Sequence, residues 1–357
     1  MSGNSSVAWG GGIANYGTVT LNNATVSGNF AALCGGGIYN DYPHFTLHAR
    51  NTIIAGNTAL GGAPDLEDNL GSLGHNLIGN TQGGYGFDVT DLLNVNPLLG
   101  PLQDNGGPTQ TMALLAGSPA LNAGDPAQLG VADQRGVVRS GGVNIGAYQA
   151  SATAFVLTAP ATATAGTPFD AAVQAVDPFG QTAVGYTGTV HFSSSDGQAV
   201  LSSDYGYTNA DAGTHTFTNG VTLKTAGNQT VTGTDIVTAS ITGSASVSVN
   251  PAAADHLLFL QQPTDTPAGQ TISPVVVEVV DQFGNVETGD NTDTITLSIG
   301  VNPSGGTLSG TLTLTVVNGV ASFSDLSIDL AGAGYTLHAS IGGDLPDMDS
   351  DPFTITM

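Results

Sequence analysis

The residues best suited to chemistry in the first half of the chain are one arginine and a nearby group of acids. Arg50 is the only basic residue before Arg135, and Asp65, Glu67 and Asp68 follow it. A polysaccharide lyase needs carboxylates that hold Ca²⁺ and a basic group that abstracts a proton. A glycosidase needs two carboxylates that face each other across the sugar bond. One arginine and three acids in a loop meet neither requirement, so we expect no catalytic residues in this chain.

Two further groups have the spacing of metal ligands. His44 and His48 lie four residues apart, but no third ligand is near them in the sequence. The second group consists of four alternating acids in the segment GDLPDMDSD: Asp344, Asp347, Asp349 and Asp351. This segment has neither the glycine nor the twelfth-position glutamate of an EF-hand. We therefore predict solvated acids and no metal or cofactor, with weak structural Ca²⁺ binding as the alternative.

The charge balance excludes two classes of partner. The 357 residues include 28 acidic and four basic side chains, a formal charge of −24. Nucleic-acid binding requires Lys and Arg to release phosphate counterions, and anionic membrane surfaces also attract basic segments. No run of 18 apolar residues is present to span a bilayer. We therefore predict no nucleic-acid partner and no membrane insertion within this chain.

Internal repeats predict the element that would position these side chains. The repeats are GGGIAN at 10–15, GGGIYN at 35–40, NTIIAGN at 51–57 and NLIGN at 76–80, with offsets of 25 residues within each pair. Short β-branched runs between Gly and Asn turns at a fixed period indicate a solenoid with one coil per repeat and stacked parallel strands. The expected apolar stacks are Ile13 on Ile38 and Ile53 on Ile78, and the expected amide ladders are Asn15–Asn40 and Asn51–Asn76.

The period is lost after Asn80, and in residues 96–149 Gly-Pro, Ser-Pro and Asp-Pro turns separate short apolar runs. An open solenoid end exposes unpaired strand edges. We expect this segment to close the last coil and cover its edge, with Met112–Leu115 folded back onto the stack. Asp133, Arg135 and Arg139 lie in the segment DQRGVVR, and an ion pair among them is expected to fix the loop of this cap.

The ordered motifs GGGI.N, NTIIAGN, PLLGPLQDNGGPTQTMALL, GSPALNAG, DQRGVVR and NIGAYQ resemble the choice-of-anchor Q family. The resemblance covers Ser2 to Gln149. It implies a pectate-lyase-like, right-handed parallel β-helix of the kind found on bacterial surface proteins. Gln149 stands where the closing motif of that family usually has Glu, and Met1 begins in mid-repeat. We therefore expect this chain to be a fragment or the product of a truncated gene.

The second half of the chain is duplicated. ATAGTPFDAAVQAVDPFGQ at 163–181 matches TPAGQTISPVVVEVVDQFGN at 266–285, at an offset of about 100 residues, the size of an immunoglobulin-like sandwich. These segments resemble bacterial immunoglobulin-like repeats, and the resemblance covers Thr153 to Thr356. It implies a stalk, a spacer or an adhesive tip. The turns at 177–180 and 281–284 are each predicted to carry a buried Phe.

We predict an all-β protein in three parts: residues 1–150, the C-terminal part of a right-handed parallel β-helix with its cap, and residues 151–252 and 253–357, two immunoglobulin-like β-sandwiches. The predicted function is structural or adhesive, outside the bacterial cell or on its surface, with extracellular glycans or surface proteins as partners. The alternative is a polysaccharide-binding or polysaccharide-cleaving β-helix protein whose active coils lie outside this chain.

Overall fold

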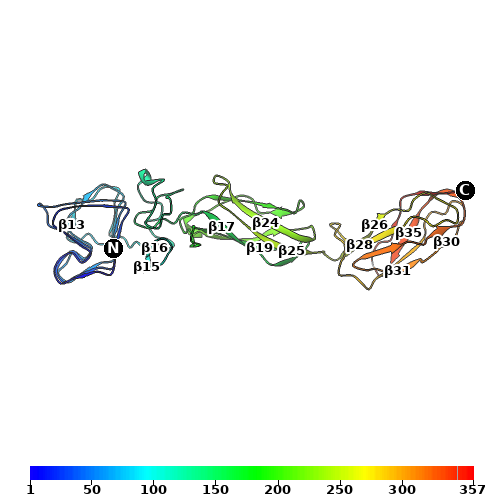
Figure 1. Ribbon diagram of the computed structural model, residues 1–357, viewed down its shortest axis with the longest axis horizontal. Coiled ribbons are helices and arrows are strands. Elements are labelled where there is room, and N and C mark those ends of the chain that lie inside the picture. Colours follow the sequence, from blue (N-terminus) through cyan, green and yellow to red (C-terminus); the bar gives the residue numbers. More distant parts are fainter. Residues whose placement is uncertain (344) are drawn as a thin grey trace.

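The computed structural model describes residues 1–343 and 345–357. The chain is drawn out along one axis, with short strands in a stack at one end and two sandwiches following in a row (Figure 1). Within the described residues, the helical elements are two single 3₁₀ turns, η1 (Pro126–Gln128) and η2 (Asn209–Asp211). The described part of the chain has no helix with the length and hydropathy needed to cross a membrane.

The first part of the chain is a stack of coils, and each of the first three coils gives one short strand to each of four parallel sheets. The first sheet contains β1 (Ser5–Ser6), β5 (Phe30–Ala31) and β9 (Thr58–Ala59). The second contains β2 (Ile13–Asn15), β6 (Ile38–Asn40), β10 (Leu66–Asn69) and β13 (Gly84–Tyr85). The third contains β3 (Thr18–Asn22), β7 (Thr46–Arg50) and β11 (Gly71–Ser72). The fourth contains β4 (Thr25–Val26), β8 (Ile53–Ile54), β12 (Leu77–Ile78) and β14 (Leu92–Leu93).

The strand register confirms one predicted apolar stack and corrects the other. Ile13 pairs with Ile38, as predicted. Ile53 pairs with Leu77, so the predicted stack of Ile53 on Ile78 is wrong, and Ile78 pairs with Ile54 instead. The segment NLIGN has one residue fewer than NTIIAGN between its first Asn and its apolar pair. A slip of one residue would have moved every side chain to the opposite face of the sheet.

The fourth sheet is buried on both of its faces. Val26, Ile54 and Ile78 belong to the cluster inside the stack, whereas Ile53 and Leu77 belong to a separate cluster on the outer face. All five side chains are at most 1% exposed. Side chains of successive residues in a strand point to opposite faces. The adjacent apolar pairs in β8 and β12 therefore fill two cores at once.

Residues 94–150, called the cap below, cover this outer face. The cap contains the antiparallel hairpin of β15 (Leu99–Gln103) and β16 (Thr111–Leu114), and its buried Leu114 and Ile145 pack with Ile53 and Leu77. Further along, the Gly146 N–H donates to Asn51 O at 2.9 Å. The predicted position over the end of the last coil is therefore corrected. The adjacent apolar residues of β8 and β12 give the fourth sheet an apolar outer face, and Leu114 and Ile145 of the cap bury it.

The chain next forms sandwich 1, in which two sheets enclose one apolar cluster. One sheet contains β17 (Ala154–Thr158), β19 (Pro168–Val176), β23 (Thr214–Thr222) and β21 (Val200–Leu201). The other contains β18 (Thr162–Thr164), β25 (Thr242–Asn250), β24 (Gly227–Asp235), β20 (Thr189–Ser194) and β22 (Tyr205–Gly206). Alternate residues of the long strands, such as Ala171, Val173 and Ala175, are buried, as the sequence pattern predicts for a half-buried sheet.

Sandwich 2 repeats this arrangement with shorter sheets around a second apolar cluster. The first sheet contains β26 (Ala254–Gln261), β28 (Val275–Asp281) and β32 (Val320–Phe323). The second contains β27 (Thr266–Pro267), β37 (Phe353–Thr356) and β34 (Gly332–Tyr335). The third contains β31 (Thr313–Thr315), β29 (Thr294–Ile299), β35 (Leu337–Ile341) and β36 (Met348–Asp349), and β30 (Leu308–Ser309) pairs with β33 (Ser327–Ile328).

Buried asparagines connect the coils of the stack. The predicted ladder between Asn15 and Asn40 is present, since Asn15 Nδ2 donates to Asn40 Oδ1 at 2.7 Å. The predicted Asn51–Asn76 ladder is wrong: Asn51 Nδ2 donates to Asn23 Oδ1 at 2.7 Å and to Asn144 O of the cap at 2.9 Å. Asn51 thus connects one neighbouring coil and the cap, and Asp125 N of the cap donates to its Oδ1 at 3.0 Å.

Candidate functional site at the joints between modules

The structure separates the residues that could have formed a lyase-like site. Arg50 lies at the end of β7, and its Nε is 3.6 Å from Asp125 Oδ2 of the cap. Glu67 and Asp68 lie on β10 in a different sheet. Asp65 is 2% exposed, and burial raises the pKa of its carboxyl group. The single arginine of the stack is thus engaged with the cap and not with these three acids.

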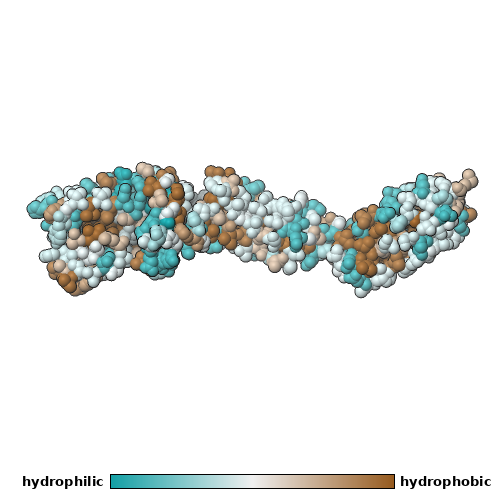
Figure 2. Space-filling view, in the orientation of Figure 1, coloured by the Kyte–Doolittle hydropathy of each residue, from teal (hydrophilic) through white to brown (hydrophobic). Residues whose placement is uncertain are grey.

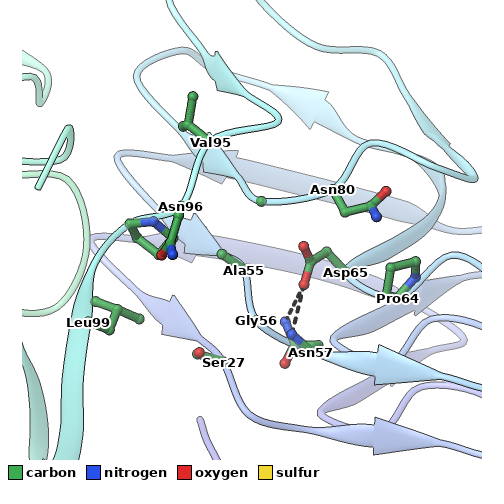
Figure 3. A pocket seen from close by; sticks show the side chains of 12 residues that line it. Ser27, Ala55, Gly56, Asn57, Pro64, Asp65, Asn80, Val95, Asn96 and Leu99 are labelled. Atoms are coloured by element: carbon green, nitrogen blue, oxygen red, sulfur yellow. Dashed lines mark hydrogen bonds between the residues drawn. The ribbon is translucent and has the colours of Figure 1, made fainter.

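Asp65 lines a pocket of about 430 Å³ between the stack and the start of the cap (Figure 3). Its Oδ1 accepts hydrogen bonds from Asn57 N at 3.0 Å and Asn57 Nδ2 at 2.9 Å. Of the described residues that line the pocket, Asp65 is the one with an ionisable side chain. Glycoside hydrolysis requires two carboxyl groups. This carboxylate ends an amide ladder instead, because Asn57 Oδ1 in turn accepts from Asn29 Nδ2 at 2.9 Å.

The candidate metal ligands have other contacts. His48 Nδ1 lies 3.0 Å from Gly71 O, and the exposed His44 lies beside the ring of Phe45. Among the described residues, no group of three or more His, Cys, Asp or Glu side chains is placed to hold a metal ion. In the acidic segment, Asp347 and Asp349 both contact His338. Asp344 lies outside the described residues.

The contacts of His338 predict a pH dependence of sandwich 2. Its hydrogen bond to Asp349, together with the charges of Asp349 and Asp347, raises the pKa of His338. A raised pKa in the folded state stabilises the fold below the unfolded value of about 6.5, and this stabilisation is lost as pH rises through the folded value. Because the pair is exposed, we expect an effect below about 1 kcal/mol. His338→Gln should reduce the difference in unfolding midpoint between about pH 5.5 and about pH 8, and equal differences in the two proteins would contradict this assignment.

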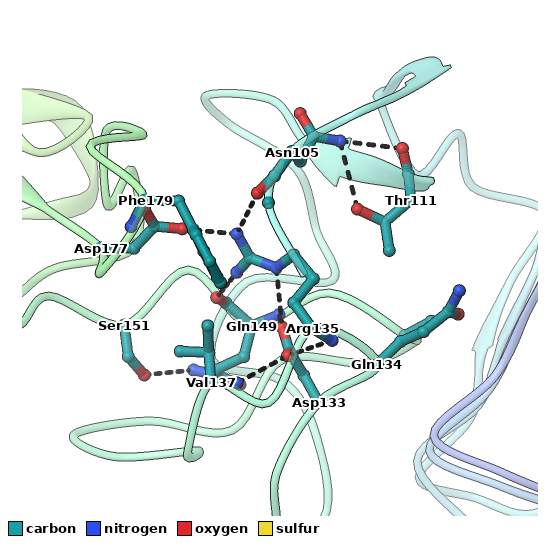
Figure 4. Close-up of polar contacts among 12 residues, drawn as sticks. Asn105, Thr111, Asp133, Gln134, Arg135, Val137, Gln149, Ser151, Asp177 and Phe179 are labelled. Atoms are coloured by element: carbon teal, nitrogen blue, oxygen red, sulfur yellow. Dashed lines mark hydrogen bonds and ion pairs between the residues drawn. The ribbon is translucent and has the colours of Figure 1, made fainter. Parts of the chain in front are cut away.

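A buried polar cluster lies between the cap and sandwich 1, and we call this contact joint 1 (Figure 4). It is centred on Arg135, which is 4% exposed. Arg135 Nε lies 3.1 Å from Asp133 Oδ2, the predicted ion pair. Its Nη1 donates to Asp177 Oδ2, in the turn after β19, and to Asn105 O at 3.0 Å. Its Nη2 donates to Gln149 O at 2.7 Å. One side chain thus joins three segments of the cap to sandwich 1.

Two aromatic rings lie beside the Arg135 guanidinium group. Its central carbon is 3.8 Å from the ring centroid of Tyr148 and 5.6 Å from that of Phe179. Burial by itself would lower the pKa of Arg135, but the contacts with Tyr148, Asp177 and Asp133 outweigh burial and raise it. The side chain therefore stays charged, and the two carboxylates have a permanent counter-ion.

Arg139 is also buried in the cap, at 1% exposed, and it binds carbonyl groups. Its Nη1 donates to Asn144 O at 2.9 Å and its Nη2 to Gly146 O at 2.7 Å. In the described part of the chain no carboxylate lies within ion-pair distance of it. Gln149 Oε1 accepts from its Nη1 at 3.2 Å, so an amide occupies the position at which the family resemblance predicts a glutamate. Burial lowers the pKa of Arg139.

Phe179 closes joint 1 over a glycine of the cap. An ideal Cβ on Gly106 would lie 2.1 Å from Phe179 Cγ, so the ring rests directly on the Gly106 backbone. The sequence predicts this Phe to be buried. That prediction is wrong, because Phe179 is 42% exposed and contacts the cap. The turn follows the end of β19 and is closed by the Gly180 N–H, which donates to Asp177 O at 3.0 Å. The ring therefore lies at the end of the sandwich, over Gly106 of the cap.

The contact of Phe179 with Gly106 predicts how much stability a Gly106→Ala substitution should cost. Gly106 has φ +89° and Gly117 has φ +77°, and nothing lies within 4 Å of a Cβ placed on Gly117. Gly117→Ala should therefore cost only the left-handed backbone strain of about 1–2 kcal/mol. Gly106→Ala should cost about 1 kcal/mol more, because Phe179 must leave its contact. The free energies of unfolding of the two variants provide the comparison, and equal losses would show that Phe179 contributes nothing to the joint.

The corresponding turn of sandwich 2 makes joint 2 with sandwich 1. Asp281 Oδ1 accepts from Phe283 N at 2.8 Å and from Asn285 N at 2.9 Å. Its Oδ2 accepts from Ala252 N, in the linker, at 2.8 Å. Asp177 likewise accepts from Phe179 N with its Oδ1 and from the preceding module with its Oδ2. In each turn, one carboxylate oxygen forms the turn and the other holds the module before it.

The rest of joint 2 also matches joint 1. Phe283 lies over Gly166, where an ideal Cβ would be 2.5 Å from its ring, and it packs against the core cluster of sandwich 1. Lys224 Nζ is 5.8 Å from the centroid of the same ring. Asn285 donates to Lys224 O at 2.7 Å and accepts from Ala226 N at 2.8 Å. Each joint thus combines a Phe over a left-handed glycine with a nearby cation and a turn aspartate.

Figure 2 shows hydrophobic residues gathered over the part of sandwich 2 that faces joint 2, while the outline narrows between the two sandwiches. Sequence reasoning identified the two Asp-x-Phe-Gly turns but missed their contacts with the preceding module. The positions of the basic residues could have indicated these contacts. Two of the four Lys and Arg side chains, Arg135 and Lys224, lie at these two joints.

No family model matches the chain, and no curated protein does. Among solved structures, the chain is similar to the Escherichia coli adhesin FdeC, at 20% identity over 60% of this chain and 67% of that one, with a TM-score of 0.31. It is similar to domains 4–9 of the surface layer protein SbsC at 18% identity, over 60% of this chain and 33% of that one, with a TM-score of 0.24. A glycosyl hydrolase family 2 member from Bacteroides cellulosilyticus is 11% identical over 53% of this chain, with a TM-score of 0.25.

The chain spans 23% of the length of that glycosyl hydrolase and 33% of the surface layer protein segment. TM-scores of this size do not establish a shared fold. The all-β architecture therefore rests on the strands of the chain itself, and its function on the geometry of the joints.

Proposed function

We propose that this chain is a non-catalytic structural or adhesive protein that works outside the bacterial cell or on its surface. Residues 1–150 are the C-terminal part of a right-handed parallel β-helix of the choice-of-anchor Q type. Residues 151–252 and 253–357 are immunoglobulin-like sandwiches that act as its stalk. In this role the β-helix is the recognition region, and extracellular glycans or surface proteins are its partners.

The observation that carries the proposal is the buried polar contact of joint 1. A mobile linker between independent domains is exposed and rich in small or polar residues. Here Arg135 and Asp177 are at most 4% exposed and connect the two modules across the boundary. Leaving either charge unpaired in a buried site costs several kcal/mol. The joint therefore favours one fixed orientation, which is the property a spacer needs to hold a recognition surface away from its support.

One surface of the stack favours glycan binding as a second candidate function. Trp9 and Tyr39 are stacked with centroids 5.8 Å apart, and Tyr16 lies 6.2 Å from Tyr39. Trp9 is 44% and Tyr16 56% exposed. Tyr39 pairs in register with Glu67 of the next coil. Large exposed rings beside a hydrogen-bonding acid form a surface on which the apolar face of a sugar can lie.

Incubation with a panel of polyuronates and neutral glycans tests both candidates. We expect no new reducing ends and no unsaturated products above background, because the stack presents a single arginine and no paired carboxylates. Turnover that disappears in Arg50→Ala would contradict the non-catalytic proposal. For the second candidate, Trp9→Ala should weaken binding of a retained glycan about tenfold. Leu60→Ala is the matched control, since Leu60 directly follows β9 and is also exposed.

A further inference from the structure

The acceptor surface that sandwich 1 offers at joint 2 is present again on sandwich 2. Gly166 N–H donates to Leu223 O, and Gly269 N–H donates to Ile328 O, both at 2.8 Å. Ala165 N–H donates to Asn250 O, and Ala268 N–H to Thr356 O, both at 2.9 Å. The two sets of bonds fix the correspondence between the sandwiches. The matched positions are Gly166 with Gly269, Lys224 with Asp329, Thr225 with Leu330, and Ala226 with Ala331.

At joint 2 this surface is covered, whereas on sandwich 2 it is open. A Cβ on Gly166 would strike the ring of Phe283, but nothing lies within 4 Å of a Cβ placed on Gly269. Both glycines have a left-handed backbone, with φ +76° and +73°, so both present a bare backbone to an approaching group. Leu330, at the edge of the same surface, is 45% exposed. We call the surface formed by Gly269, Asp329, Leu330 and Ala331 the end face.

We propose that the end face docks the Asp-x-Phe-Gly-Asn turn of another sandwich of the same kind. The Phe of that turn lies on Gly269 and against Leu330. Its Asn accepts from the Ala331 N–H and donates to the Asp329 carbonyl, as Asn285 does with Ala226 and Lys224. The inference rests on the proposed spacer function and extends it, because it makes the sandwich a unit that can be added head to tail.

The occupant is a sandwich with a free turn, and a second copy of this chain does not supply one. In this chain the Asp177 turn is engaged by the cap, and the Asp281 turn is engaged by sandwich 1. Asp329 stands where joint 2 has Lys224, so the docked ring loses the nearby cation. The exposed apolar side chain of Leu330 replaces the polar Thr225 and provides the contact for that ring instead.

The test compares the chain with a version in which residues 252–357 are repeated directly after Met357. This places Met357 where joint 2 has Pro251, since Thr356 corresponds to Asn250. The measurement is native-state hydrogen exchange of the Ala331 amide, with the Ala226 amide of joint 2 as the internal reference. We expect exchange at Ala331 at least about tenfold slower in the extended protein. Phe283→Ala in the added copy should return it to the parent rate.

Equal exchange at Ala331 in the parent and extended proteins would overturn the inference. Slow exchange that survives Phe283→Ala in the added copy would overturn it as well. That variant leaves the cores intact, because Phe283 packs against the preceding module. The Ala226 amide distinguishes failure of the end face from failure of the proposed function. If Ala226 is protected and Ala331 is not, the end face alone fails, whereas fast exchange at both would contradict the fixed joints of the proposed function.

Discussion

Arg135→Ala is expected to destabilise the chain by about 3–5 kcal/mol, the cost of removing one partner from a buried ion pair. The variant leaves the carboxylates of Asp133 and Asp177, both below 10% exposed, without their counter-ion. It also removes the donors to Asn105 O and Gln149 O. The free energy of unfolding in urea, followed by far-ultraviolet circular dichroism, measures the loss.

Arg50→Ala is the matched control for this prediction. Arg50 also forms an ion pair with an acid of the cap, but its side chain is 38% exposed and its Nε is 3.6 Å from Asp125. Exposed pairs contribute about 0–1 kcal/mol, so the control should lose little stability. A loss for Arg135→Ala as small as that for Arg50→Ala would mean that joint 1 does not hold the cap and sandwich 1 together.

Ile53→Ala and Ile54→Ala are each expected to cost about 2–5 kcal/mol, the range for large apolar side chains removed from a core. The two residues are adjacent in β8, and both are fully buried, on opposite faces of the fourth sheet. If the cap did not cover the outer face, Ile53 would be exposed and its replacement nearly neutral. The pair of variants therefore tests the position of the cap.

Trp9, the single tryptophan, lies in the stack and allows its unfolding to be followed by fluorescence. Leu60→Ala serves as the surface control, since Leu60 is 79% exposed, and its change should stay within about 0.5 kcal/mol. A large loss for Ile54→Ala together with a negligible one for Ile53→Ala would place the cap elsewhere.

The stack was predictable because its turns repeat. The segments GGGIAN and GGGIYN carry the same glycines at the same spacing, and Ile13 pairs with Ile38 as that spacing requires. Coil length is less regular than the motifs suggest. Five residues, 41–45, separate β6 from β7, whereas two separate β2 from β3. Changes of this kind alter the offset between coils. Ile53 pairs with Leu77, 24 residues later, because NLIGN has one residue fewer than NTIIAGN before its apolar pair, and a fixed period of 25 therefore misplaced its partner.

Contacts between distant segments were the part that sequence patterns did not reveal. The ion pair of Arg135 with Asp133 is local and was predicted, but its bond to Asp177 crosses 42 residues and a module boundary. The adjacent apolar pairs of β8 and β12 did indicate that the outer face of the fourth sheet is buried. An alternating strand exposes one face, whereas consecutive apolar residues indicate a strand buried on both. That rule predicts a covering segment without identifying the cap as the cover.

The most direct test of the central claim, that buried joints hold the modules in one orientation, is a pulsed electron resonance distance measurement across joint 1. Spin labels are placed at Val89 on the stack side and Val237 on sandwich 1, which are 98% and 87% exposed, in a Cys34→Ser background. We predict one narrow distance distribution that broadens in Asp177→Ala. A distribution that is already broad in the parent protein, and unchanged by Asp177→Ala, would contradict it.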